Sequence, residues 1–133
     1  MERLKVLLIE PLEKPRLVEI DHTLEEMRRL VGGPIACTYP WKDLVGLVHC
    51  DTGVEQGFPL NRMLKDENGK IYDVVPGTFF LTGLSEDDFC SISDELAEKF
   101  SEMFKYPEVY MRTENDHVIC FRLGSGKGPI PVF

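Results

Sequence analysis

Residues 46–62 read GLVHCDTGVEQGFPLNR, and the path of this stretch decides how the rest of the chain can be arranged. Two short apolar segments flank Asp51-Thr52-Gly53, and the Pro59-Leu60-Asn61-Arg62 segment follows them. Short loops with glycine commonly join antiparallel strands, because glycine tolerates positive φ. The stretch therefore predicts a β-hairpin, with strands over residues 44–50 and 54–58 and with Gly53 at positive φ.

Asn61 and Arg62 are the strongest binding candidates in this stretch. The planar guanidinium of arginine binds carboxylate or phosphate through two parallel hydrogen bonds, and an asparagine side chain can brace a loop. The competing interpretation is structural, and ion pairing in an acidic protein favours it. In that case Arg62 pairs with an acidic neighbour such as Asp51 or Asp73 and ties the hairpin to the sheet, and Asn61 caps a turn or a short helix.

Asp51-Thr52-Gly53 also matches the nucleophile signature of aspartic peptidases, in which two such aspartates share a proton. Val54 stands where those enzymes carry a small or hydroxyl residue, and the same three residues are ordinary in turns. His49 and Cys50 are neighbours on one predicted strand, so their side chains point to opposite faces and do not form a dyad. We therefore assign no catalytic residue, and a non-enzymatic protein is the preferred interpretation.

The spacing of potential ligand residues along the sequence does not support a metal or cofactor site. A metal site would have to gather ligands from four distant segments, and nothing in the sequence enforces this. The candidates for it are His22, His49, Cys50, Asp51 and His117. We predict neither a metal nor a cofactor, and we keep His49 and Asp51 as binding candidates together with Trp41. This aromatic residue lies in a Tyr-Pro-Trp turn, where it either binds a partner or packs over the adjacent sheet edge.

Outside the central stretch, the pattern predicts two helices and several short strands. Thr23-Leu24-Glu25-Glu26 fits a capping box, and Gly32-Gly33-Pro34 ends that helix. The second helix spans residues 93–104, with Ser93 as its N-cap. Strands are predicted over residues 4–9, 16–20, 35–39, 71–75, 78–82, 109–112 and 118–122, and Asn68-Gly69 predicts a type I′ turn.

These elements predict an α+β fold: a mixed, mainly antiparallel sheet of six to eight short strands, packed by two helices. Residues 1–123 form one domain in this interpretation, and residues 124–133, which begin with Gly124-Ser-Gly-Lys-Gly128, form a mobile tail. A chain of 133 residues is long enough to bury a sizeable core without a disulfide or a metal.

Composition narrows the class of protein. The formal net charge of −8 argues against direct nucleic-acid binding, which needs clustered lysine and arginine, so we expect a protein partner. No apolar run approaches the length of a membrane span, and the MERLKVLLIEP start has no signal-peptide pattern, so we expect a cytoplasmic protein with no membrane contact. The four cysteines are isolated and are expected to be free thiols.

Four segments of the chain resemble a family of small domains, the domain of unknown function 3846. They are KVLLIEPLEKPRLVEIDHTLEEMRRLVGGPI (5–35), PLNR (59–62), GKIYDVVPGTFFLTG (69–83) and DDFCSISDE (87–95). The resemblance covers residues 4 to about 100 and implies a phage, plasmid or Firmicutes context without an established activity.

Together, these observations lead us to expect an accessory protein of a mobile element that acts by binding a macromolecule, for example a host defence component. Its acidic second helix and the Glu86-Asp87-Asp88 run suit a version in which the protein mimics DNA charge. The alternative is a small enzyme or ligand-binding domain with its site near the 46–62 hairpin.

Overall fold

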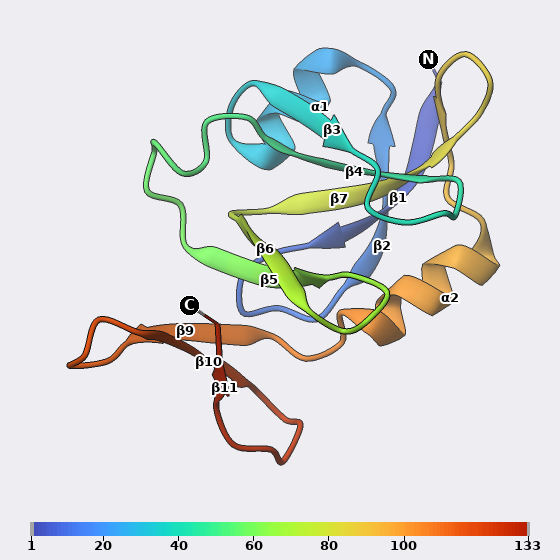
Figure 1. The fold of residues 1–133 in the computed structure, drawn as a ribbon. Coiled ribbons are helices and arrows are strands. Elements are labelled where there is room, and N and C mark those ends of the chain that lie inside the picture. The colour runs from blue at the N-terminus through green and yellow to red at the C-terminus, as the bar shows by residue number, and fades with distance from the viewer. Residues whose placement is uncertain (1, 133) are drawn as a thin grey trace.

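The computed structural model describes residues 2–132, and a six-stranded antiparallel sheet forms its centre (Figure 1). The strands follow the order β2-β1-β7-β4-β3, and β8 pairs with the end of β7. Their bounds are β1 Arg3–Ile9, β2 Arg16–Asp21, β3 Ile35–Thr38, β4 Val45–Cys50, β7 Phe79–Leu84 and β8 Phe89–Cys90. The predicted strand over residues 4–9 and its hairpin with the next strand are confirmed, because β1 pairs with β2 from Arg3↔Asp21 to Leu8↔Arg16.

Two helices cover opposite faces of this sheet, as Figure 1 shows. Helix α1 (Leu24–Val31) begins where the Thr23 hydroxyl accepts a hydrogen bond from the Glu26 amide, and it ends at Gly32 with φ of 86°. Helix α2 (Asp94–Met103) begins at Ser93, whose hydroxyl accepts from the Leu96 amide. Both N-caps were predicted from the sequence and are confirmed.

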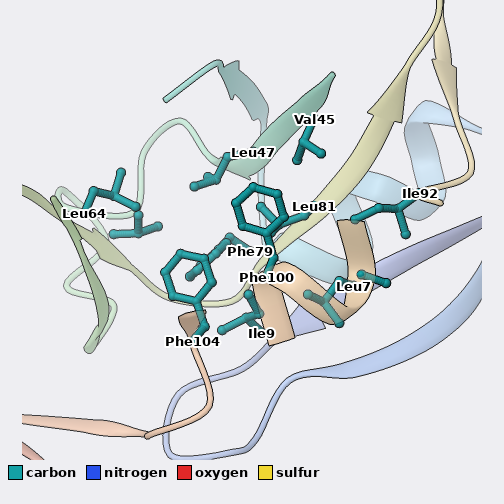
Figure 2. Packing of buried hydrophobic residues seen from close by; sticks show 12 residues of the cluster. Leu7, Ile9, Val45, Leu47, Leu64, Phe79, Leu81, Ile92, Phe100 and Phe104 are labelled. Carbon is teal, nitrogen blue, oxygen red and sulfur yellow. The ribbon is translucent and has the colours of Figure 1, made fainter. Parts of the chain in front are cut away.

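Each face of the sheet has its own apolar core, and this explains the continuous apolar run in β1. Val6 and Leu8 pack under α1, while Leu7 and Ile9 point to the other face. On the α2 side, the rings of Phe79, Phe100 and Phe104 form the centre of the cluster drawn in Figure 2. Alternation along a strand buried on both sides thus supplies both cores.

A second sheet of two strands, β5 (Leu60–Lys65) and β6 (Ile71–Pro76), lies on the α2 side of the main sheet. A third sheet packs beyond it and contains β9 (Glu108–Arg112), β10 (Val118–Arg122) and β11 (Ile130–Pro131). Met63, Val74 and Cys120 form a small core between these two sheets. The segment predicted to be a mobile tail therefore contains a strand, since Cys120 of β10 pairs with Ile130 of β11.

The second half of the predicted 46–62 hairpin is wrong. β4 already lies between β3 and β7, so neither of its edges is free to pair with residues 54–58. Those residues instead form consecutive turns, in which the Gln56 amide donates to the Thr52 carbonyl and the Phe58 amide to the Gly53 carbonyl, both over 3.0 Å. Gly57, rather than Gly53, takes positive φ, at 72°.

The predicted hairpin around Asn68-Gly69 exists as β5–β6, but its type I′ turn is wrong. Gly69 has φ of 79°. Among the other residues of 2–132 that are not glycine, only Leu12 and Asp116 have positive φ, so Asn68 does not adopt the left-handed conformation that a type I′ turn needs. The Asp66 carboxylate accepts hydrogen bonds from the amides of Asn68 and Lys70, both over 2.9 Å. This side-chain turn holds Asn68 at negative φ and leaves the left-handed position to Gly69.

The predicted α+β class with two helices is confirmed. Within residues 2–132, eleven strands divide among three sheets, whereas the sequence predicted one sheet of six to eight strands. Two of the additional strands, β8 and β11, have only two residues each, which is too short for an alternating pattern to appear in the sequence.

Candidate functional site

Asn61 and Arg62 lie at a β-bulge near the start of β5. Leu60 pairs with Pro76 and Arg62 pairs with Val75, so Asn61 is an extra residue on its strand. A bulge re-aims a side chain out of the normal alternation. The two consecutive side chains therefore meet, and Arg62 Nη1 donates to Asn61 Oδ1 over 2.8 Å.

The Asn61 side chain joins β5 to the main sheet. Its Nδ2 donates to the carbonyl of Ile9 over 2.9 Å and to the carbonyl of Gly77 over 2.8 Å. Ile9 ends β1, and Gly77 connects β6 to β7. The predicted role as a cap of a turn or short helix is replaced by this link between two sheets.

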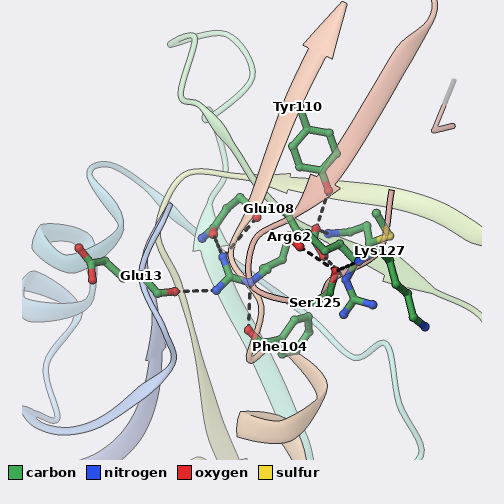
Figure 3. A network of polar contacts seen from close by, with 10 residues as sticks. Glu13, Arg62, Phe104, Glu108, Tyr110, Ser125 and Lys127 are labelled. Carbon is green, nitrogen blue, oxygen red and sulfur yellow. Dashed lines mark hydrogen bonds and ion pairs between the residues drawn. The ribbon is translucent and has the colours of Figure 1, made fainter. Parts of the chain in front are cut away.

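Arg62 is fully buried and binds main-chain carbonyls (Figure 3). Nε donates to the Phe104 carbonyl over 3.1 Å, and Nη2 donates to the Glu13 carbonyl over 2.6 Å. The predicted pairing with Asp51 or Asp73 is wrong, because the guanidinium is enclosed by these carbonyls and by Asn61. Neither Asn61 nor Arg62 has exposed surface to offer a partner, since both are 0% exposed.

A buried carboxylate accompanies this buried cation. Glu108, at 4% exposure, accepts hydrogen bonds from the Met63 amide over 2.8 Å and the Tyr110 hydroxyl over 2.7 Å. Burial lowers the pKa of Arg62, and the negative charge of Glu108 opposes that shift. Burial, followed by the charge of Glu108, raises the pKa of the Tyr110 phenol far above its usual range. This network attaches the third sheet to β5.

His49 and Asp51 do not converge on a common site. His49 Nδ1 lies 3.0 Å from the Cys50 carbonyl oxygen, and its ring lines a small cavity of about 40 Å³ beside Leu64 and Asp73. Asp51 is exposed in the turn after β4 and does not line this cavity. Of the five predicted binding residues, Asn61 and Arg62 are thus buried connectors. His49 and Asp51 are polar side chains that lie apart from each other.

The fifth, Trp41, lines a groove of about 800 Å³ with three walls. One wall is the 39–43 segment between β3 and β4, the second is the β5–β6 hairpin, and the third is the C-terminal half of α2. The lining residues with large side chains include Trp41, Leu64, Tyr72, Met103 and Phe104. Trp41 is fixed against the core, because its ring centroid lies 4.4 Å from that of Phe100 and 6.0 Å from that of Phe104.

Large apolar and aromatic side chains of the groove remain exposed. The exposed fraction is 53% for Tyr72 and 40% for Met103. The exposed ring of Tyr39 lies instead over Gly46 and Cys37, on the α1 face of the sheet. Clustered exposed aromatic surface on a soluble protein commonly marks an interaction site. The groove is therefore the strongest candidate functional site among residues 2–132.

Lysines and carboxylates line the groove in equal number. Lys99 Nζ lies 2.6 Å from Asp43 Oδ2, and Lys42 Nζ lies 3.4 Å from Glu67 Oε1. The second pair is loose, because its two side chains are 91% and 81% exposed. The groove thus offers paired charges around an apolar floor, in a chain of net charge −8.

Sequence reasoning identified Trp41 but missed Tyr72 and Met103 as members of the same surface. The Tyr39-Pro40-Trp41 segment was the available signal. Tyr72 comes from a hairpin about thirty positions away, and its approach to Trp41 depends on how the second sheet packs on the first.

Two other kinds of feature are absent from residues 2–132. No group of three or more histidine, cysteine, aspartate or glutamate side chains in that range is arranged to hold a metal ion. None of the helices in the same range has the length and apolar character needed to cross a membrane.

Comparison with protein families gives a match over residues 4–105 to the model described as "Domain of unknown function (DUF3846)". No curated protein and no solved structure matches the chain. The matched range contains β1 to β8 and both helices, and it also contains every residue that lines the groove. The third sheet lies outside the matched range.

Proposed function

Since the chain belongs to the DUF3846 family, whose description names no activity, we propose its function from its surface: a non-enzymatic protein that binds a segment of a partner protein in the Trp41 groove. The observation that carries this proposal is the exposure of Tyr72 and Met103 in the groove that the fixed Trp41 also lines. Aromatic side chains held rigidly in this way are typical anchors of protein interfaces.

The position of the polar residues favours binding over catalysis. The two residues with the most distinctive chemistry, Asn61 and Arg62, are buried and hydrogen-bonded to main-chain carbonyls. Neither His49 nor Asp51 lines the groove, and Asp51 does not line the small cavity beside His49. A small enzyme would need a nucleophile or an acid–base pair that converges on bound substrate, and the groove is lined instead by lysine–carboxylate pairs and aromatic rings.

The biological setting that we propose is that of an accessory protein of a mobile element. The resemblance to a phage and plasmid family makes a host protein, such as a defence component, the first partner class to test. The acidic net charge of −8 favours a partner with a basic surface.

Site-specific photo-crosslinking tests the proposed groove. A photoreactive phenylalanine analogue replaces Tyr72 in the groove, and in a matched control it replaces Met111, which is 52% exposed on β9. We expect a discrete crosslinked protein from host lysate with the Tyr72 probe and not with the Met111 probe. Addition of Met103→Ala, which shortens another exposed side chain of the groove, should reduce the product. Equal products at both positions, or none at Tyr72, would overturn the assignment of the groove.

A further inference from the structure

The main sheet ends in β2 on one side and in β3 on the other, and the main chain of β3 has an outward-facing edge (Figure 1). In the ladder between β3 and β4, the Asp51 amide donates to the Pro34 carbonyl over 2.7 Å. Along an antiparallel strand, the main-chain groups of successive residues face the paired strand and the opposite side in turn. Every second residue from Pro34 therefore faces β4, while the amides and carbonyls of Ile35 and Cys37 point outward.

The edge of β2 is closed by a charged side chain. Arg3 Nη2 donates to the Glu19 carbonyl over 3.2 Å, and Arg3 Nη1 lies 2.7 Å from Asp21 Oδ1. The guanidinium thus occupies a main-chain acceptor of the strand that ends the sheet. Charged side chains at a sheet edge oppose pairing with another strand, so β2 does not offer a surface for strand addition.

Side chains also cap main-chain amides of the second sheet. The Met63 amide of β5 donates to the Glu108 carboxylate and the Val74 amide of β6 donates to the Asp73 carboxylate, both over 2.8 Å. By contrast, β3 (residues 35–38) contains no charged residue, and no side chain of residues 2–132 hydrogen-bonds its outward main-chain groups. β3 is therefore the open edge of the main sheet.

We infer that two copies of this chain pair through β3, antiparallel and about a two-fold axis at Cys37. Pro34 and Pro40 flank residues 35–39, and Cys37 is the midpoint of that segment. Pairing about the midpoint aligns the two segments over their whole length, and outward donors of each copy meet outward acceptors of the other. The prolines limit the pairing to these residues, because proline has no amide proton to extend a ladder.

The side chains brought together by this pairing are uncharged. Tyr39 is 62% exposed over Gly46 and Cys37 on the α1 face, and Ile35 packs on the same face. Pairing about Cys37 places Tyr39 opposite Ile35 of the second copy. Cross-strand pairs of an aromatic and a β-branched side chain stabilise a sheet, so the contact covers an exposed ring and sets no like charges opposite each other.

A second copy fits this edge better than an unrelated strand does. The facing segments carry no charge, so the repulsion between two chains of net charge −8 is not concentrated at the contact. A two-fold axis uses the β3 edge of both copies, while Arg3 keeps both β2 edges closed. The assembly therefore stops at two copies instead of growing into a fibre. This inference is independent of the partner proposed for the Trp41 groove.

Hydrogen exchange of the ¹⁵N-labelled protein, at millimolar and at low micromolar concentration, tests the pairing residue by residue. The amides of Ala36 and Thr38 bond to β4 and should exchange slowly at both concentrations. The amides of Ile35, Cys37 and Tyr39 should exchange about tenfold or more slowly at the higher concentration, because pairing supplies their acceptors. Sedimentation velocity should show twice the mass of the chain there. Exchange of these three amides that is independent of concentration, or a single mass throughout, would overturn the inference.

Two lysine substitutions compare the two edges of the sheet. Cys37→Lys sets a charge opposite its own copy and should leave only the single mass in sedimentation. Leu17→Lys is the matched control, since Leu17 lies on β2 and is 45% exposed, and it should still dimerise. The amide spectrum of each variant verifies its fold. Dimerisation that is lost in Leu17→Lys and kept in Cys37→Lys would place the contact on β2 and contradict the pairing.

Thiol crosslinking tests the same contact without a charge in the strand. In the inferred pairing the two Cys37 Cα atoms lie about 5.5 Å apart, and both thiols face the α1 side. A short bis-maleimide should therefore give a crosslinked dimer of the original protein and of Cys90→Ser, in which the other partly exposed thiol is absent. Cys37→Ser should give none. No crosslinked dimer, or one that depends on Cys90 instead of Cys37, would contradict the axis at Cys37.

Discussion

Arg62 Nε donates a 3.1 Å hydrogen bond to the carbonyl of Phe104, the residue that caps the C-terminus of α2. The last turn of α2 contains no basic residue, although a cation is favourable at that end of a helix. Arg62 supplies the cation from β5, across a separation of 42 positions. The same guanidinium binds the Glu13 carbonyl, so one side chain joins a helix end, a bulged strand and the β1–β2 turn.

Arg62→Ala should lower the free energy of unfolding by about 3 kcal/mol or more, because it leaves the Phe104 carbonyl and Asn61 Oδ1 buried without their donor. Arg16→Ala is the matched control, since that guanidinium is exposed and pairs with Glu10 on the surface, and it should cost less than about 1 kcal/mol. Urea unfolding monitored by Trp41 fluorescence measures both. Similar costs for the two variants would contradict the structural role of Arg62.

Gly83→Ala should destabilise the fold by about 1–3 kcal/mol, because its Cβ would lie 2.6 Å from the Ser91 carbonyl oxygen and 2.9 Å from Cys90 Sγ. β7 is a central strand, so this contact cannot be relieved without moving β8. Gly128→Ala has nothing within 4 Å of the added Cβ and should change stability by less than about 0.5 kcal/mol. Thermal unfolding of both proteins decides the comparison, and an unchanged Tm for Gly83→Ala would show that β8 is not held against β7.

Stability should fall as the pH rises above about 9, because two acids between the second and third sheets stay protonated in the folded state. Burial raises the pKa of the Cys120 thiol from 9.0 to about 11, and it raises the pKa of the Tyr110 phenol above its ordinary value of 10.0. Between the unfolded and folded pKa values, the unfolded chain binds fewer protons, so the free energy of unfolding decreases with pH.

Urea unfolding between pH 8 and about 11 measures this slope. Tyr110→Phe removes one of the two acids together with its hydrogen bond to Glu108, so it should lower stability at pH 8 and flatten the alkaline decline. If stability declines as steeply with pH in Tyr110→Phe as in the original protein, Tyr110 does not contribute to the alkaline loss of stability.

All four cysteines are free thiols, and their reactivity should divide them into two pairs. Cys37 and Cys90 are partly exposed and should react with iodoacetamide in the folded protein. Cys50, at 2% exposure, and Cys120, at 0%, should react only after unfolding. Peptide mass spectrometry after labelling with and without denaturant identifies each site. Early modification of Cys120 would indicate that the third sheet separates readily from β5.

Local chemistry allowed the sequence to predict most of the elements. The caps at Thr23, Ser93 and Gly32 depend on side chains within a few positions of one another, and the apolar run of β1 reports burial on both faces. The prediction of a 46–62 hairpin was wrong because the sequence pattern of a strand does not show which of its edges are already paired. In the structure, β3 and β7 pair with the two edges of β4.

The sequence by itself determined the α+β class, both helices and the importance of Asn61, Arg62 and Trp41 as unusual residues. Only the tertiary structure decided their roles. Asn61 and Arg62 became buried connectors because a bulge turned both side chains toward carbonyls of distant segments. Trp41 became part of a groove because the β5–β6 sheet brings Tyr72 to the opposite wall. Caps and periodicity act over a few residues, whereas burial and groove formation depend on contacts between segments far apart in the chain.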